Sequence, residues 1–136
     1  MVEKLNESNV FSFEKLFNKA LKKHDFIDIQ TMNAEKCILL YKEGTNYVGF
    51  LEGFVEKSKV TNLNVGHIVA LYVLPSYRNE GKAYSMMLKF EEWIKEYSCS
   101  DIVVGMSLKD KKSLDFFEKY SFENMGTHIF MKKSVS

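Results

Sequence analysis

The sequence predicts a mixed α/β fold, on three observations. The chain opens with apolar residues at helical spacing, continues with a β-rich stretch that contains a hairpin signal, and then alternates strand-like and helix-like segments. Its 136 residues fit one domain, which we take to span residues 1–136. With 46% hydrophobic and 27% charged residues, the composition is that of an ordinary globular domain.

The first element is a helix expected from about Asn9 to His24. Its apolar face is formed by Phe13, Leu16, Phe17 and Ala20. Ser8 or Asn9 is expected to cap the start of this helix, because both side chains can accept hydrogen bonds from free backbone N–H groups.

A hairpin and a long strand come next. Residues 37–41 and 47–51 flank the turn-like residues 43–46, and this arrangement predicts a hairpin. Residues 67–74 are apolar on both faces, which is typical of a central strand that is buried on both sides. Pro75 ends this strand, because proline has no N–H group to donate to a sheet.

Helical periodicity then returns and alternates with short strands. The next helix carries an apolar stripe of Ala83, Met86, Met87, Phe90, Ile94 and Tyr97. Residues 101–106 predict a short buried strand. Asp110 is expected to cap a helix over residues 111–119, and residues 122–125 and 128–131 predict two closing strands. The inward residues of that helix are expected to be Leu114, Phe116 and Phe117.

Charge and cysteine content narrow the function classes. The 19 basic and 18 acidic residues give a net charge of +1, whereas a domain that binds nucleic acid normally has a strong basic excess. No apolar run approaches the roughly 20 residues of a membrane helix, and no secretory signal core is visible. Cys37 and Cys99 are expected to be free thiols. We therefore expect a cytoplasmic protein without nucleic-acid or membrane partners.

The stretch after Pro75 carries the most chemical information. A buried strand ends there, and a helix opens after a short polar turn, which places free N–H groups and the positive end of a helix dipole together. Such a helix start binds phosphate well. Gly81 lets an anion approach the backbone, and Arg78 and Lys82 add positive charge, while the Glu80 side chain can point to solvent. The predicted phosphate-binding residues are Arg78, Asn79, Glu80, Gly81, Lys82 and Ala83.

Two motifs make the sequence resemble the GNAT acyltransferase superfamily. That superfamily carries Q/R-x-x-G-x-G/A after a strand of the form apolar-x-V-x-P, and residues 72–83 match this arrangement. Its second pattern, N-x-x-A-x-x-x-Y-x-x-x-G-F, aligns with residues 110–122. The order of elements also agrees, so the resemblance covers nearly the whole chain. It implies a central mixed, mostly antiparallel sheet flanked by helices, with strands four and five splayed to admit coenzyme A.

The resemblance also assigns roles in cofactor binding. The N–H groups of residues 78–83 would hold the pyrophosphate of coenzyme A. Backbone groups of Leu71, Tyr72 and Val73 would bind the pantetheine arm. Asp110 and Ser113, which occupy the Asn and Ala positions of the second pattern, are expected at the cofactor as well. Acetyl-CoA is thus the expected co-substrate.

The chain departs from the family pattern at the proton donor. Phe117 stands where the family often has the Tyr that protonates the leaving thiolate, and Ser121 replaces the usual Gly. Tyr120 or Tyr84 could take over, and Tyr120 is the candidate that we carry forward. The alternative stays open that Tyr120 is a half-buried aromatic with its hydroxyl group at the surface.

The acceptor amine needs a base, because only roughly one in a thousand lysine-like amines is neutral at pH 7. The candidates are His67, Glu52 and Glu56, although a strand-end histidine and a solvated strand face would explain them too. A backbone N–H of Tyr72 or Val73 would polarise the thioester oxygen. The three histidines show no metal-ligand spacing, so no metal is expected.

The leading hypothesis is an N-acetyltransferase in which an amine, of a small molecule or a protein, attacks the thioester of acetyl-CoA directly. The alternative is a non-catalytic module that binds or senses acyl-CoA on the same scaffold. A third hypothesis is an interaction protein that has lost the ligand. The sequence leaves open the acceptor, the oligomeric state and catalytic activity, although exposed strand edges are compatible with a homodimer.

Overall fold

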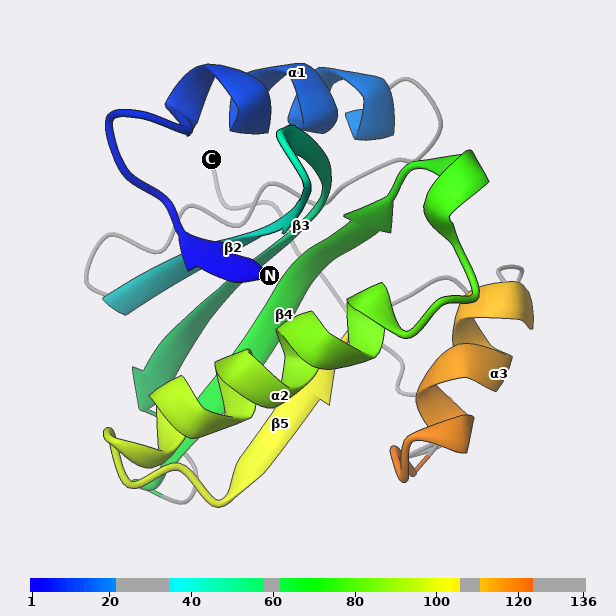
Figure 1. Cartoon of the computed structure of the whole chain (residues 1–136). Coiled ribbons are helices and arrows are strands. Elements are labelled where there is room, and N and C mark those ends of the chain that lie inside the picture. Colours follow the sequence, from blue (N-terminus) through cyan, green and yellow to red (C-terminus); the bar gives the residue numbers. More distant parts are fainter. Residues whose placement is uncertain (22–34, 58–61, 106–110, 124–136) are drawn as a thin grey trace, which may run out of the picture. The chain divides into compact units, whose positions relative to one another are not determined.

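The computed structural model describes residues 1–21, 35–57, 62–105 and 111–123, and the chain divides into two units, Met1–Gly105 and Met106–Ser136. The elements of the first unit are β1 (Val2–Lys4), α1 (Val10–Leu21), β2 (Glu35–Glu43), β3 (Asn46–Lys57), β4 (Asn64–Val73), a 3₁₀ turn (Pro75–Tyr77), α2 (Lys82–Lys95) and β5 (Asp101–Val104). The second unit contains α3 (Lys111–Lys119). The expected mixed α/β fold is confirmed (Figure 1).

The first unit is built on a five-stranded sheet with the order β1-β2-β3-β4-β5. Neighbours from β1 to β4 are antiparallel, and between β2 and β3 the turn at Gly44, whose φ is +62°, reverses the chain directly. β5 pairs with β4 in parallel, because α2 carries the chain back across the sheet between them. The prediction of a mixed, mostly antiparallel sheet flanked by helices is therefore confirmed.

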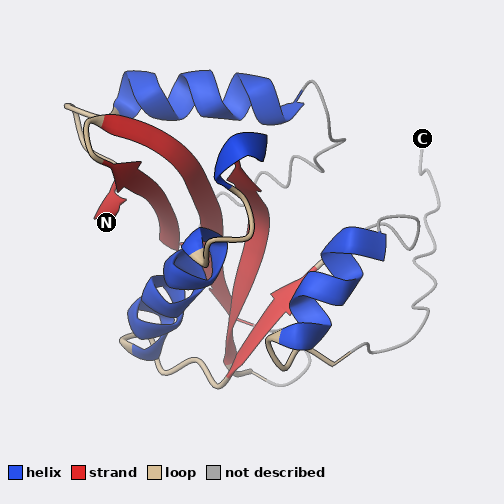
Figure 2. Cartoon of the chain, turned by 45° about the vertical axis from the view of Figure 1, so that its right-hand side comes forward, coloured by secondary structure: helices blue, strands red, loops and turns tan. Residues whose placement is uncertain are grey.

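The residues of β3 alternate between two covered faces of the sheet. Phe50 packs against Phe13 and Phe17 of α1, with ring centroids 5.3 and 6.0 Å apart. Gly53 faces α2 instead, and a Cβ atom there would lie 2.5 Å from the ring of Phe90. Since odd and even residues of a strand point to opposite faces, α1 and α2 cover opposite sides of the sheet (Figure 2).

The helices bury most of the residues that their periodicity predicts. The predicted α1 residues Leu16 and Ala20 lie in a buried cluster with Leu40, Phe50, Ala70 and Tyr72 of the sheet. The buried residues of α2 are Lys82, Met86, Met87, Phe90, Trp93 and Ile94. Trp93 and Lys82 were not expected in this stripe, and Tyr97 lies beyond the end of the helix.

Several expectations about burial are wrong. β4 is buried at alternate positions from Gly66 to Tyr72 and again at Val73, and the strand that is more completely buried on both faces is its neighbour β3. β5 is not a buried strand, because Val103 is 47% exposed. In α3 only Phe117 is buried. Phe122 and Glu123 belong to no strand, while the rest of the predicted closing strands and the cap Asp110 lie outside the described residues.

The strand β1 and its connection to α1 were only partly predicted from the sequence. The three residues of β1 pair with β2, with Val2 opposite Tyr41, and they were not predicted as a strand. Asn9 stands directly before α1 and is fully buried. Its side-chain oxygen accepts a 2.7 Å bond from the Asn6 N–H, and its amide donates to the Lys4 carbonyl at 3.0 Å. Asn9 therefore fastens the helix start to the preceding strand.

Both cysteines are free thiols, as predicted. Cys37 is buried on β2, and burial raises the pKa of its thiol to about 11. In the part of the chain that the structure describes, no helix is long and apolar enough to cross a membrane.

Candidate functional site

The two strands β4 and β5 separate halfway along β4. Their parallel pairing runs from Val65 opposite Asp101 to Ile68 opposite Val104, where β5 ends. β4 continues to Val73 and, within the described residues, is paired there only with β3. Figure 2 shows the two strands diverging from a common end. The expected splay of strands four and five is consistent with this pairing.

A β-bulge coincides with the point of separation. Glu52 of β3 lies opposite Ala70, but the next residue, Gly53, lies opposite Ile68. Val69 is therefore the extra residue on β4. A bulge bends its strand and increases the local twist, which turns the second half of β4 away from β5.

The backbone of this second half of β4 has one open edge. The N–H of Leu74 donates to Val48 of β3 at 2.8 Å, so that the groups of Tyr72, two residues earlier, also face β3. The groups of Leu71 and Val73 face the opposite edge, where β5 has already ended. Leu71 and Val73 fit the expected contact with an extended ligand. The expectation for Tyr72 is wrong, because its backbone pairs with β3.

The turn after β4 presents backbone N–H groups at the start of α2. Asn79 and Gly81 have φ angles of +65° and +78°, in the left-handed region, and Gly81 is the N-cap of α2. Within the described chain, the N–H groups of residues 79–83 have no acceptor. A Cβ atom on Gly81 would meet nothing within 4 Å, so the space beside it is open. This arrangement fits a bound pyrophosphate.

The side chain of Arg78, at the start of this loop, makes contacts within the protein. Nε of Arg78 donates to the carbonyl of Val73 at 2.8 Å, and its guanidinium group lies over the ring of Tyr72 at 5.5 Å. The side chain is otherwise exposed. Arg78 therefore ties the loop to the end of β4 and can still face an anion.

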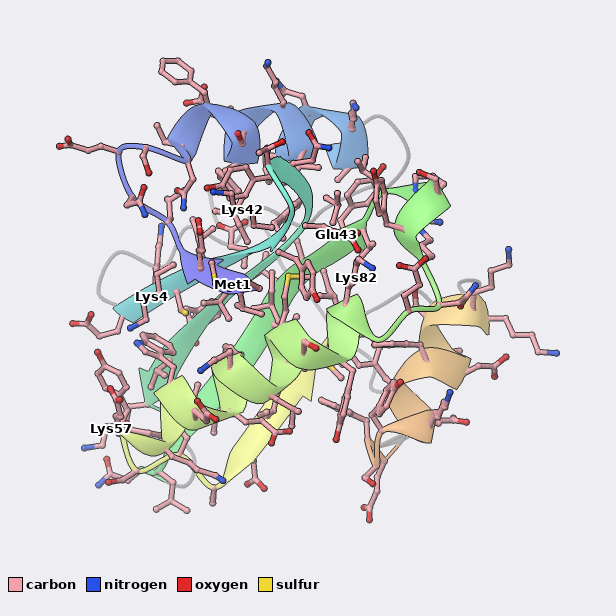
Figure 3. The ribbon with its side chains drawn as sticks, viewed as in Figure 1. Met1, Lys4, Lys42, Glu43, Lys57 and Lys82 are labelled. Atoms are coloured by element: carbon pink, nitrogen blue, oxygen red, sulfur yellow. The ribbon has the colours of Figure 1, made fainter. Side chains whose placement is uncertain are left out.

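Lys82, the first residue of α2, is directed inward and is only 5% exposed. Its Nζ lies 3.4 Å from Oε2 of Glu43, which ends β2 (Figure 3). The same amine also pairs with Glu80. The hydrogen bond to Glu80 is the main cause that raises the pKa of Lys82 above its ordinary value. The expectation that Lys82 adds positive charge for a phosphate is wrong, because its buried amine pairs with the two carboxylates. The Glu80 side chain is 53% exposed, so it lies at the surface as expected, although its carboxylate also pairs with Lys82.

Two of the three candidate bases lie together. His67 of β4 stacks on Phe54 of β3, with ring centroids 4.6 Å apart and planes at 6°. Its Nε2 lies 4.0 Å from Oε2 of Glu56. Burial lowers the pKa of His67 and outweighs the opposing effect of Glu56, so the neutral imidazole is favoured near pH 7. Glu52 is half-buried, on the same face of β3 as Phe54 and Glu56.

The remaining candidate site residues, Asp110, Ser113 and Tyr120, belong to the second unit. Ser113 lies half-buried on α3. The half-buried Tyr120 follows α3, and its ring packs against Phe116 at 4.9 Å, with Nζ of Lys119 5.6 Å from the ring centroid. Asp110 lies outside the described residues. Because this unit is described by itself, the roles of Ser113, Tyr120 and Asp110 stay predictions.

A shallow pocket lies at the β1–β2 side of the sheet and is lined by Lys4, Leu5, Lys36, Cys37, Ile38 and Trp93. It is separate from the open edge of β4. The described residues contain no group of three or more His, Cys, Asp or Glu side chains that could hold a metal ion.

Comparison with known proteins identifies the family. The model of the acetyltransferase (GNAT) family matches residues 2–122. The chain belongs to this family. An aminoglycoside N(6')-acetyltransferase type 1 from Acinetobacter haemolyticus is 22% identical, over 98% of both chains. Membership confirms the prediction of an N-acetyltransferase that uses acetyl-CoA.

Solved structures of this GNAT family share the fold. AAC(6')-Iy in complex with the bisubstrate analog CoA-S-monomethyl-acetylneamine has a TM-score of 0.84 and 16% identity, and the match covers 99% of this chain and 98% of that one. A ribosomal-protein-alanine N-acetyltransferase from Brucella melitensis has a TM-score of 0.76 and 16% identity, over 98% and 99% of the two chains.

Glu43 was not predicted from the sequence to lie beside Lys82 at the phosphate-binding loop. It stands in the predicted hairpin turn, where an acidic residue is ordinary, and nothing in the sequence links it to the distant Lys82. Only the folded sheet brings the β2–β3 turn to the start of α2.

Proposed function

We propose that this GNAT protein binds acetyl-CoA along the open edge of β4 and transfers the acetyl group to a primary amine. The pyrophosphate would bind the N–H groups of residues 79–83, and the pantetheine arm would pair with Leu71 and Val73. One observation carries the proposal: an unpaired strand edge runs directly into a helix start whose N–H groups have no acceptor in the described chain. Acetyl-CoA carries a thioester on an extended arm and a pyrophosphate beyond that arm. The arm matches the strand edge, and the pyrophosphate matches the helix start that follows it.

Each proton has a proposed path. Neutral His67 takes a proton from the ammonium form of the acceptor, with Glu56 beside it, and Glu52 is the alternative base. The freed amine nitrogen then attacks the carbonyl carbon and the C–S bond breaks. The leaving thiolate takes a proton from Tyr120, and Tyr120 regains a proton from the nitrogen, which loses its second proton as the amide forms. The N–H of Leu71 or Val73 polarises the carbonyl oxygen during the attack.

Two acceptor classes follow from the relatives. The curated relatives are named aminoglycoside N(6')-acetyltransferases, which makes an aminoglycoside amine the first acceptor to test. The ribosomal-protein-alanine N-acetyltransferase among the solved structures makes a protein amine the second. In both classes the attacking group is an amine that must first lose a proton.

The wider setting of the protein is proposed as follows. The family match extends over both units, which supports a single acetyltransferase domain over residues 1–136. Two free thiols fit the reducing cytoplasm. The nearly balanced charge supports a protein without a nucleic-acid partner, and the sheet edges are compatible with a homodimer.

Calorimetric titration of acetyl-CoA into the protein tests the proposal, followed by release of free thiol with aminoglycosides and with an alanine-terminated peptide. We expect saturable one-site binding and thiol release with at least one acceptor. Binding without release above background for any amine would favour the non-catalytic module. No binding at millimolar acetyl-CoA would contradict both.

A further inference from the structure

The buried amine of Lys82 connects two parts of the chain that are far apart in sequence. It pairs with Glu43 at the end of β2 and with Glu80 inside the proposed phosphate-binding loop. The rings of Tyr41 and Tyr77 lie 5.5 and 5.8 Å from its Nζ. An ammonium group has three donor hydrogens, and here two carboxylates and two ring faces surround it.

This environment does not suit a phosphate ligand. A lysine that binds phosphate presents its amine to the ligand, whereas Lys82 is 5% exposed and the carboxylates are its nearest partners. To reach a pyrophosphate, the amine would have to leave both Glu43 and Glu80. The backbone N–H groups of residues 79–83 need no such rearrangement.

Without a cation beside them, the carboxylates of Glu43 and Glu80 would repel an anionic ligand. Glu80 belongs to the loop itself, and Glu43 is held beside the start of α2 through Lys82. With Lys82 charged, the three side chains carry one net negative charge, and without it they carry two. Like charges repel more strongly at a partly buried site than in bulk water, so the loss of this cation would weaken the binding of a pyrophosphate.

We propose that Lys82 is a positioning residue for coenzyme A: it neutralises Glu43 and Glu80 and holds their carboxylates at its own amine, so that the backbone N–H groups of the loop are left to face the pyrophosphate. The inference rests on the proposed function, because it concerns the same loop. It assigns the side chain of Lys82 to the two carboxylates and not to the ligand.

Replacement of Lys82 by Met tests the charge while keeping an unbranched side chain. We expect Lys82→Met to weaken acetyl-CoA binding by about tenfold, measured by calorimetric titration. S-acetyl-pantetheine, which lacks the pyrophosphate, should give the same turnover with Lys82→Met as with the unmodified protein. Lys89→Met is the matched control, because Lys89 lies exposed on the same helix and pairs only across one turn with Glu92 in the described chain.

A triple variant separates positioning from direct contact. In Lys82→Met/Glu43→Gln/Glu80→Gln no charge is left to compensate, and replacing an ion cluster around a buried cation by neutral side chains is often tolerated. We expect acetyl-CoA binding to return to within about threefold of the unmodified protein. This variant decides the question even if Lys82→Met alone does not fold.

Three outcomes would overturn the inference. If the triple variant stays about tenfold weaker, Lys82 contacts the phosphates directly. If Lys82→Met folds and binds normally, or if S-acetyl-pantetheine turnover falls in parallel with acetyl-CoA binding, the charge of Lys82 has no specific effect on the pyrophosphate. Failure of the proposed function is distinguishable, because the unmodified protein would then not bind acetyl-CoA at all.

Discussion

The two halves of β4 belong to one continuous strand and have different surroundings. From Asn64 to Ile68 the strand is paired on one side with β3 and on the other with β5. From Val69 to Val73 it keeps only β3 among the described strands. The first half is therefore fixed by packing, while the second half offers its backbone to a ligand.

This difference shows that an apolar strand can serve as core and binding site at once. Close packing marks the paired half, where a Cβ atom on Gly66 would lie 2.9 Å from Ile94. The open half carries no specialised side chain, and its contribution is the direction of the N–H groups of Leu71 and Val73 and of the Leu71 carbonyl, since the Val73 carbonyl accepts a hydrogen bond from Arg78. Substitutions in the paired half should therefore change stability, and substitutions at the adjoining loop should change ligand binding.

The largest effect is expected from Gly53→Ala beside the paired half. The added Cβ atom would lie 2.5 Å from the Phe90 ring and 2.7 Å from the His67 carbonyl, so the helix and the sheet would have to move apart. We expect the free energy of unfolding to fall by about 3 kcal/mol, measured by urea denaturation.

Gly105→Ala is the control for that substitution. Its added Cβ atom would meet nothing within 4 Å in the described structure, so we expect a change below about 0.5 kcal/mol. Equal losses in the two variants would show that the contact between Gly53 and Phe90 does not limit the packing of the sheet.

The next largest effect is expected from Gly81→Val in the loop after the open half. A branched side chain at a φ of +78° should cost about 1–2 kcal/mol of stability, and we expect acetyl-CoA binding to weaken more than tenfold because the side chain enters the space of the pyrophosphate. Gly81→Asn separates the two causes, because Asn tolerates a left-handed backbone. Normal acetyl-CoA affinity in both variants would remove this loop from the cofactor site.

The smallest effect is expected in the pH dependence of the free energy of unfolding, and it depends on His67. Its pKa in the folded protein lies below the ordinary value of 6.5. Both states are neutral at higher pH, and as pH falls below 6.5 the unfolded chain takes up the proton first, so stability is lost. We expect His67→Gln to make the free energy of unfolding less dependent on pH between pH 7.5 and 5.5.

Glu56→Gln is the companion variant for this experiment. Glu56 raises the pKa of His67, so its removal should lower that pKa further and make the loss of stability in acid steeper. A change in the same direction for both variants would contradict the assignment of this titration to His67.

Structural features that depend on residues close together in the chain could be predicted from the sequence. Gly81 and the strand that ends before Pro75 predict the phosphate-binding loop, because the strand, turn and helix start are contiguous. The direction of the Tyr72 backbone could not be read in this way, since it depends on the register with β3. The bulge at Val69 and the burial of Lys82 also require the partners Gly53 and Glu43, which only the folded sheet supplies.

The strand order has a further consequence, for the kinetics of folding. β2, β3 and β4 are consecutive neighbours, so their pairing closes short loops and costs little chain entropy. β1 reaches β2 only across α1, and β5 reaches β4 only across α2, so both outer strands add contacts of higher sequence separation. We expect the three central strands to form first and β5 to dock late. The loop that opens α2 lies within that late crossover, so acetyl-CoA should slow unfolding more than it accelerates folding.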